Sequence, residues 1–149
     1  MPHSYHNLLY HILFSTDKRR AWIDPELQMR LYPYMCGILR NLGGVCLEIG
    51  GVEDHVHLLA RLRPDKSVSD VLRTLKANSS GWVHDTYDGY ADFAWQEGYT
   101  AFTVSESVND KVRAYIAGQT EHHRTHSFQE ELIAFLKANC IEFEERFLR

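Results

Sequence analysis

The feature that most constrains the fold of this chain is a run in which two histidines flank one apolar residue, Glu53-Asp54-His55-Val56-His57-Leu58-Leu59. In an extended strand successive side chains point to opposite faces, so His55 and His57 share one face while Val56 points into a core on the other. Two neutral imidazoles on one face are suited to bind a divalent metal ion. The spacing by itself also fits two half-exposed polar residues on a sheet.

Length and composition indicate a single globular domain over residues 1–149. A chain of 149 residues, 44% of them hydrophobic, is long enough to bury a core without covalent or metal cross-links. No apolar run is long enough to cross a bilayer, and the first residues lack the pattern of a secretory signal, so we expect a cytoplasmic protein with no membrane partner. Cys36, Cys46 and Cys140 are scattered and form no CxxC pair, which predicts reduced thiols.

The charge pattern restricts nucleic-acid binding to local patches. The formal net charge of −4 argues against a strongly basic binding protein. Residues 61–76 nevertheless carry a net charge of +3, from five basic residues against Asp65 and Asp70. In isolation, this segment is as typical of a solvated helix face as of a phosphate-binding track.

Hydrophobic periodicity, turn residues and helix caps predict six elements before residue 105. They are strands at 6–15, 45–52, 55–63 and 93–104, a helix at 25–42 after the first strand, and a helix at 68–83 after the third. The last strand is alternatively two short ones broken at Gly98. Asp24 and Ser67 are the expected N-caps of the two helices, and Pro33 is expected to bend or restart the first.

This order of elements is that of the split βαβ arrangement. It predicts the α+β class, with a ferredoxin-like (RRM-like) antiparallel sheet and helices on one face, over a core of about residues 3–106. The other face would stay open, with His55 and His57 standing on it. Many single-stranded nucleic-acid modules use such an exposed sheet.

Additional C-terminal helices are expected over about residues 107–149. The first, predicted for residues 107–123, places Tyr115 and Gln119 one turn apart on the same face. Periodicity alone favours Tyr115 as a core aromatic. A shorter helix follows at 127–136, and the alternating pattern of the tail favours an extended segment.

Four ordered segments together resemble one known family, the single-tyrosine HUH transposases of the TnpA type, which mobilise small bacterial insertion sequences. The similarity covers almost the whole chain. The segments are Tyr10-His11-Ile12-Leu13-Phe14-Ser15-Thr16; Asp54-His55-Val56-His57-Leu58-Leu59; Trp95-Gln96-Glu97-Gly98-Tyr99 leading to Phe102-Thr103-Val104-Ser105; and Tyr115-Ile116-x-x-Gln119-x-x-His122-His123 followed by Phe128-x-x-Glu131.

The resemblance implies a role for four residues of this chain. Tyr115 matches the nucleophile, and His55, His57 and Gln119 match the residues that hold a divalent metal. In the family that metal is Mg²⁺ or Mn²⁺, whereas ligand softness alone would favour Mn²⁺ or Zn²⁺ for imidazoles. The implied reaction cleaves and rejoins single-stranded DNA through a 5′-phosphotyrosine, at hairpins near the ends of the element. Two cleavages require two tyrosines, which implies a homodimer.

Basic and histidine residues outside these four are candidate DNA contacts. The residues selected on charge and position are Arg61, Arg63, Arg73, Lys76, His122 and His123. Three other functions stay open on the sequence: a non-catalytic single-stranded nucleic-acid-binding module, a domesticated relative that processes chromosomal repeats, and a metallohydrolase that uses only water. The last of these leaves the spacing of Tyr115 and Gln119 unexplained.

Overall fold

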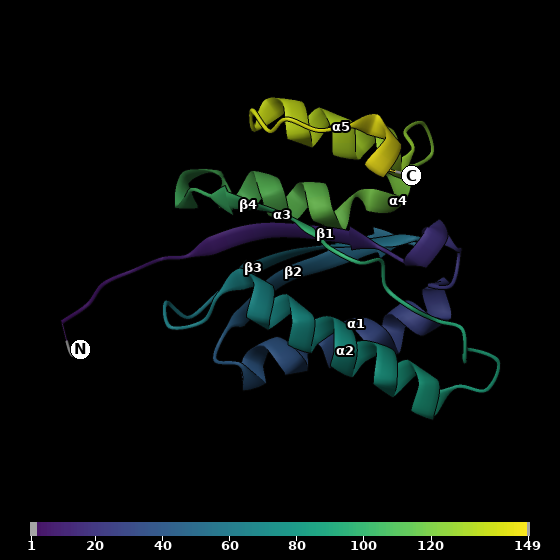
Figure 1. Ribbon diagram of the computed structural model, residues 1–149. Helices are drawn as coiled ribbons and strands as arrows, with labels where there is room; N and C mark the ends of the chain where they lie inside the picture. Colours follow the sequence, from purple (N-terminus) through teal and green to yellow (C-terminus); the bar gives the residue numbers. More distant parts are fainter. Residues whose placement is uncertain (1–2, 149) are drawn as a thin grey trace.

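The computed structural model describes residues 3–148 as a four-stranded sheet with helices on both faces (Figure 1). The strands are β1 (Leu9–Ser15), β2 (Val45–Val52), β3 (His55–Arg61) and β4 (Thr100–Val104), and the helices are α1 (Pro25–Asn41), α2 (Val68–Thr86), α3 (Asn109–Ala117), α4 (Gln119–His122) and α5 (Phe128–Ala138). Short 3-10 turns form η1 (Asp17–Arg19), η2 (Glu106–Val108) and η3 (Glu145–Phe147). The strand order β2-β3-β1-β4, antiparallel throughout, confirms the α+β, ferredoxin-like prediction.

The helices α1 and α2 cover one face of the sheet, where alternate strand positions are apolar. Ile12 and Phe14 of β1 and Val56 and Leu58 of β3 are at most 1% exposed and belong to the main hydrophobic core. Because side chains alternate along a strand, the residues between them face the opposite side of the sheet. This alternation sends His55 and His57 away from α1 and α2.

Both predicted N-caps of this helical layer are formed. The side chains of Asp24 and Ser67 each accept the backbone N–H three residues further on, at 2.8 and 3.1 Å. The helix α1 continues from Pro25 to Asn41 as a single element, so the restart expected at Pro33 does not occur.

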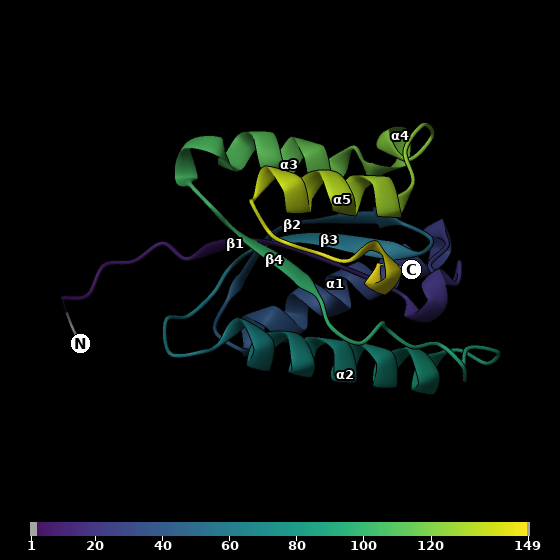
Figure 2. The ribbon, with the colours of Figure 1, turned by 45° about the horizontal axis from the view of Figure 1, so that its top comes forward.

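The second face of the sheet is covered by α3, α4 and α5, where the sequence analysis predicted an open face (Figures 1 and 2). Leu13 of β1 and Phe102 of β4 form an apolar surface on which Phe128, Leu132 and Leu136 of α5 pack. Burying these five side chains is favourable by the hydrophobic effect, which explains why the face is closed. The prediction of an exposed sheet is therefore wrong.

Two predicted element boundaries also differ from the structure. The helix predicted for residues 107–123 is divided at Gly118, a residue of low helix propensity, into α3 and α4. Of the strand predicted for residues 93–104, only β4 is regular. Gly98 precedes β4 with a φ of +80°, a left-handed conformation that ends strand pairing and that glycine adopts without strain.

The cysteines differ from the prediction of reduced thiols. Cys36 of α1 and Cys46 of β2 form a disulfide with their Cα atoms 5.3 Å apart, so the expectation is wrong for this pair. Cys140 is free and exposed. Within residues 3–148, no helix combines the length and the apolar character that crossing a membrane requires.

Candidate active site

The strand β3 presents both histidines of the sequence motif on the face covered by the C-terminal helices. His55 lies opposite Ser15 and His57 opposite Leu13 of β1, which places the pair in the central part of the sheet. Both histidines are fully buried. The hairpin predicted between β2 and β3 is present and turns directly before His55.

The C-terminal helices bring three more polar side chains to these histidines. Glu131 of α5 accepts a hydrogen bond from His57 Nε2 at 2.8 Å, and its Oε1 atom lies 3.5 Å from His55 Nε2. His123, which follows α4, donates from Nε2 to the side-chain oxygen of Gln119 at 2.9 Å. That oxygen is also 3.2 Å from His55 Nε2.

The cluster of His55, His57, His123 and Glu131 has the donors that a divalent metal needs. One ligand atom from each of the four residues lies within 4.8 Å of all the others. Three imidazole nitrogens and a carboxylate oxygen are a common ligand set for divalent ions. The side-chain oxygen of Gln119 lies beside the same atoms, so the residues present fit a bound metal.

Sequence reasoning did not identify two members of this cluster as ligands. The sequence predicts His123 as a candidate DNA contact, and Glu131 enters only as part of a segment that carries the family resemblance. An acidic residue in the first turn of a helix capped by Ser127 is ordinarily explained by the helix dipole, which conceals a second role. Only the docking of α5 on the sheet reveals that Glu131 reaches the histidines.

Burial and ion pairing set the protonation of the cluster. The Glu131 carboxylate is buried, but hydrogen bonds from His123, His55 and His57 outweigh that burial and hold its pKa well below the usual range. Burial disfavours a charged His55, yet its hydrogen bonds to Asp54 and Glu131 raise its pKa. Burial lowers the pKa of His57. The carboxylate is therefore ionised at neutral pH and His57 is neutral.

Tyr115 of α3 lies directly beside this cluster. Its hydroxyl donates a hydrogen bond to Glu131 Oε2 and is 3.2 Å from His122 Nε2. Its ring centroid is 5.8 Å from that of His57. Burial and the contact with the Glu131 carboxylate raise the pKa of Tyr115, so the hydroxyl carries its proton at neutral pH.

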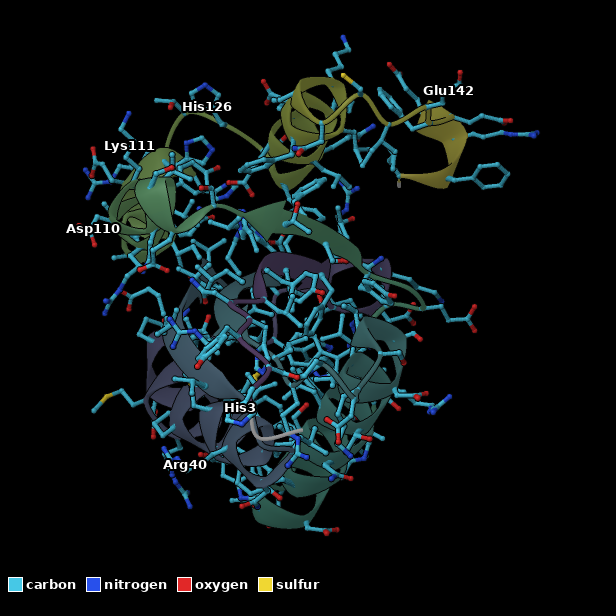
Figure 3. All side chains as sticks on the ribbon, turned by 90° about the vertical axis from the view of Figure 1, so that its left-hand side faces the viewer. His3, Arg40, Asp110, Lys111, His126 and Glu142 are labelled. Carbon is cyan, nitrogen blue, oxygen red and sulfur yellow. A yellow bond between two sulfur atoms is a disulfide. The ribbon has the colours of Figure 1, made fainter. Side chains whose placement is uncertain are left out.

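The remaining candidate DNA contacts lie apart from the cluster, with the exception of the two histidines. His122 contacts Tyr115 and stacks on His126 with a centroid distance of 4.8 Å. Arg61 donates to Asn7 at 2.8 Å. Figure 3 shows His126 in the layer of the C-terminal helices, on the far side of the sheet from α1 and α2.

Arg73 and Lys76 are the two candidates that share a surface hollow. They line a cavity of about 480 Å³ between α2 and the loop before β4, together with Trp95 and Tyr99. Lys76 donates to the Gln96 carbonyl at 2.7 Å, while Arg73 pairs with an aspartate of its own helix and is largely exposed. Arg63 lies elsewhere, paired with Asp65 at 2.8 Å.

Close contact between α3 and β2 fixes the position of Tyr115, and this contact requires a glycine. A Cβ atom added at Gly50 would overlap the backbone carbonyl oxygen of Ile116, the residue after Tyr115. We expect Gly50→Ala to reduce the free energy of unfolding by about 1–3 kcal/mol, because α3 must move off the sheet. Urea unfolding measures the change.

The matched control for that substitution is Gly81→Ala in α2, where an added Cβ meets nothing within 4 Å. This variant is expected to be stabilised by roughly 0.5–1 kcal/mol, since alanine loses less backbone entropy in a helix. Equal unfolding curves for the Gly50 and Gly81 variants would contradict the close packing of α3 on β2.

Comparisons with known proteins agree on one kind of relative. The family profile described as "Transposase IS200 like" matches residues 4–119. The ISDra2 transposase TnpA of Deinococcus radiodurans is 24% identical over 119 residues, covering 76% of this chain and 85% of its own. The transposase of insertion sequence element IS200 from Salmonella typhimurium is 27% identical over 130 residues, covering 83% and 84%.

Solved structures give the same fold. A protein from Deinococcus radiodurans R1 that is assigned as a transposase superposes with a TM-score of 0.63 at 23% identity, covering 78% of this chain and 94% of its own. A REP-associated tyrosine transposase bound to a REP hairpin superposes with a TM-score of 0.62 at 15% identity, covering 80% and 71%.

Proposed function

Because this chain belongs to the family of IS200-like transposases, we propose that it cleaves and rejoins single-stranded DNA with Tyr115 as the nucleophile. The observation that carries the proposal is the convergence of two groups on one carboxylate. Glu131 accepts a hydrogen bond from the Tyr115 hydroxyl through one oxygen and from His57 through the other. The proposed nucleophile and a proposed metal ligand thus contact the same side chain.

A divalent metal, Mg²⁺ or Mn²⁺, would be held by His55 and His57 together with the side-chain oxygen of Gln119. His123 and Glu131 are close enough to these atoms to complete the ligand set. When bound, the ion would offset the negative charge that develops on a phosphate under attack. A neutral His57 supports this role, because an imidazole binds a metal through an unprotonated nitrogen.

The proposed reaction exchanges one phosphoester bond for another. The Tyr115 oxygen bonds to the scissile phosphorus, and the bond from phosphorus to the 3′-oxygen of the preceding nucleotide breaks. The products are a 5′-phosphotyrosine and a 3′-oxygen that takes up a proton to become a free hydroxyl. Because the pKa of Tyr115 is raised, its hydroxyl must lose a proton during attack, and Glu131 Oε2 and His122 Nε2 lie within reach of it.

The proposed substrate is single-stranded DNA that forms hairpins at the ends of an insertion sequence. The structural relative bound to a REP hairpin supports a hairpin ligand for this fold. Each tyrosine forms one covalent link, so excision and joining need a homodimer. Since Glu131 lies between Tyr115 and the buried histidines, we expect α5 to shift when a phosphate enters.

The experiment that tests the proposal follows the two halves of one oligonucleotide. Single-stranded DNA from the flanks of the gene is labelled at either end and incubated with the protein and Mn²⁺ or Mg²⁺. A 5′-phosphotyrosine predicts that the 3′ label migrates with the protein on a denaturing gel, while the 5′ label is released with a free 3′-hydroxyl. Binding without any covalent adduct would favour the non-catalytic module instead.

A further prediction concerns the cavity beside α2. If Arg73 contacts a phosphate, Arg73→Ala should reduce the slope of log affinity against log salt by roughly 0.7, the value for one contact on a single strand. Arg40, an exposed arginine in the last turn of α1 that does not line this cavity, is the matched control. Salt titrations of oligonucleotide binding measure both slopes. An unchanged slope in the Arg73 variant would remove this residue from the DNA contacts.

A further inference from the structure

A further buried histidine, His11 of β1, lies beside the proposed metal ligand His57. It is 4% exposed and faces the same side of the sheet as His57, because Leu13, two residues along the strand, is paired with His57. Its ring packs edge-on against Phe135 at a centroid distance of 5.1 Å. Its Nε2 atom is 2.8 Å from Nδ1 of His57.

The direction of this hydrogen bond depends on which nitrogen of His57 carries a hydrogen. A neutral imidazole has one N–H and one lone pair, so a partner on one nitrogen fixes the role of the other. While His57 Nε2 donates to Glu131, its Nδ1 must accept a hydrogen bond from His11. If Nε2 gives its lone pair to a metal, Nδ1 carries the hydrogen and His11 must accept it.

A neutral imidazole at position 11 can fill both roles, because it exchanges donor for acceptor by moving its own hydrogen to the other nitrogen. The ligand His55 has a different partner. Its Nδ1 is 2.7 Å from the Asp54 carboxylate, which accepts hydrogen bonds and cannot donate them. The Asp54 carboxylate therefore fits only forms of His55 with a hydrogen on Nδ1, whereas the imidazole at position 11 fits both neutral tautomers of His57.

We propose that His11 is a positioning residue that holds the His57 ring with Nε2 toward the metal site and matches both of its tautomers. The inference rests on the proposed function, in which His57 is a metal ligand. Hydrogen-bond partners of this kind orient ligating histidines and raise their basicity. His11 thus acts through His57 and touches neither the metal nor the DNA.

The test compares the affinity of the protein for Mn²⁺ alone, measured from the free-ion signal in electron paramagnetic resonance. His11→Phe keeps a ring against Phe135 and removes the hydrogen bond, and we expect it to weaken binding about 10–100-fold. His11→Gln can donate or accept through its amide and should bind within about threefold of the wild type. His6→Phe removes an exposed histidine and serves as the control.

The pattern across these variants separates the hydrogen bond from simple packing. If His11 acts only by packing, His11→Phe should bind Mn²⁺ better than His11→Gln, and this result would overturn the inference. Mn²⁺ affinity within twofold of the wild type in a folded His11→Phe variant would overturn it as well. If His11→Phe does not fold, His11→Asn takes its place in the test. The asparagine side chain is one methylene shorter than that of glutamine, so its amide should not reach His57 and Mn²⁺ binding should also be weaker. Wild-type protein that binds no Mn²⁺ would overturn the metal site itself.

Discussion

Replacing Tyr115 by phenylalanine is expected to abolish the covalent protein–DNA adduct, by a factor of about 10³ or more. The substitution removes only the hydroxyl oxygen that would bond to phosphorus. The ring contacts with His57, His11 and Phe135 remain. Glu131 keeps its histidine partners, so we expect the free energy of unfolding to change by only about 1 kcal/mol.

The measurement is adduct formation on a denaturing gel, with oligonucleotide binding followed in parallel. The Tyr115 variant should bind single-stranded DNA as the wild type does, because it keeps the charge of the site. Tyr5→Phe, at a tyrosine that is 93% exposed, is the matched control and should form the adduct normally. An adduct that persists in the Tyr115 variant and carries the DNA on another residue would disprove the assignment of the nucleophile.

The sequence predicted one half of the candidate site because local periodicity determines it. Strand alternation requires His55 and His57 to share a face, and helical spacing requires the same of Tyr115 and Gln119. The short turn before His55 fixes the hairpin that carries the pair. These inferences need only neighbouring residues. The structure agrees on the histidine pair and the hairpin, and Tyr115 and Gln119 both reach the cluster although the predicted helix is divided between them at Gly118.

The other half of the site depends on contacts between distant segments. Gln119 is 64 residues from His55, and Glu131 is 74 residues from His57. Periodicity shows that α5 has an apolar side, but it does not show which surface that side covers. Leu13 and Phe102 lie on strands whose other face already packs on the core under α1 and α2, so the sequence pattern of these strands does not require a second covered face. The closed face, and with it the role of Glu131, therefore emerged only from the tertiary structure.

The disulfide between Cys36 and Cys46 likewise depends on tertiary packing. Ten residues separate the two cysteines, and the turn after α1 returns β2 alongside the helix. A CxxC motif indicates cysteines that are close in the sequence. Cys36 and Cys46 are instead brought together because a helix packs on an edge strand of the sheet.

Replacing His57 by alanine is expected to abolish both metal binding and the adduct while the protein stays folded. The substitution removes one proposed ligand and leaves the Glu131 carboxylate with one hydrogen-bond donor fewer. Losing a hydrogen-bond partner of a metal ligand typically weakens metal binding about 10–100-fold. Because His57→Ala removes a direct ligand, we expect Mn²⁺ affinity to fall about 100-fold or more. Stability should fall by about 1–3 kcal/mol, because Glu131 loses one hydrogen bond and the buried His11 loses its partner.

Metal binding and adduct formation should fail together in this variant, whereas oligonucleotide binding should persist, since the basic residues of α2 lie on the other side of the sheet. His126→Ala is the informative control: this exposed histidine stacks on His122 at the same end of the molecule but is not one of the four clustered ligands. Chelation of the wild type should reproduce the His57→Ala result, and added Mn²⁺ should restore only the wild type. A metal-dependent adduct in the His57 variant, or an equal loss in the His126 variant, would show that the ion is held elsewhere.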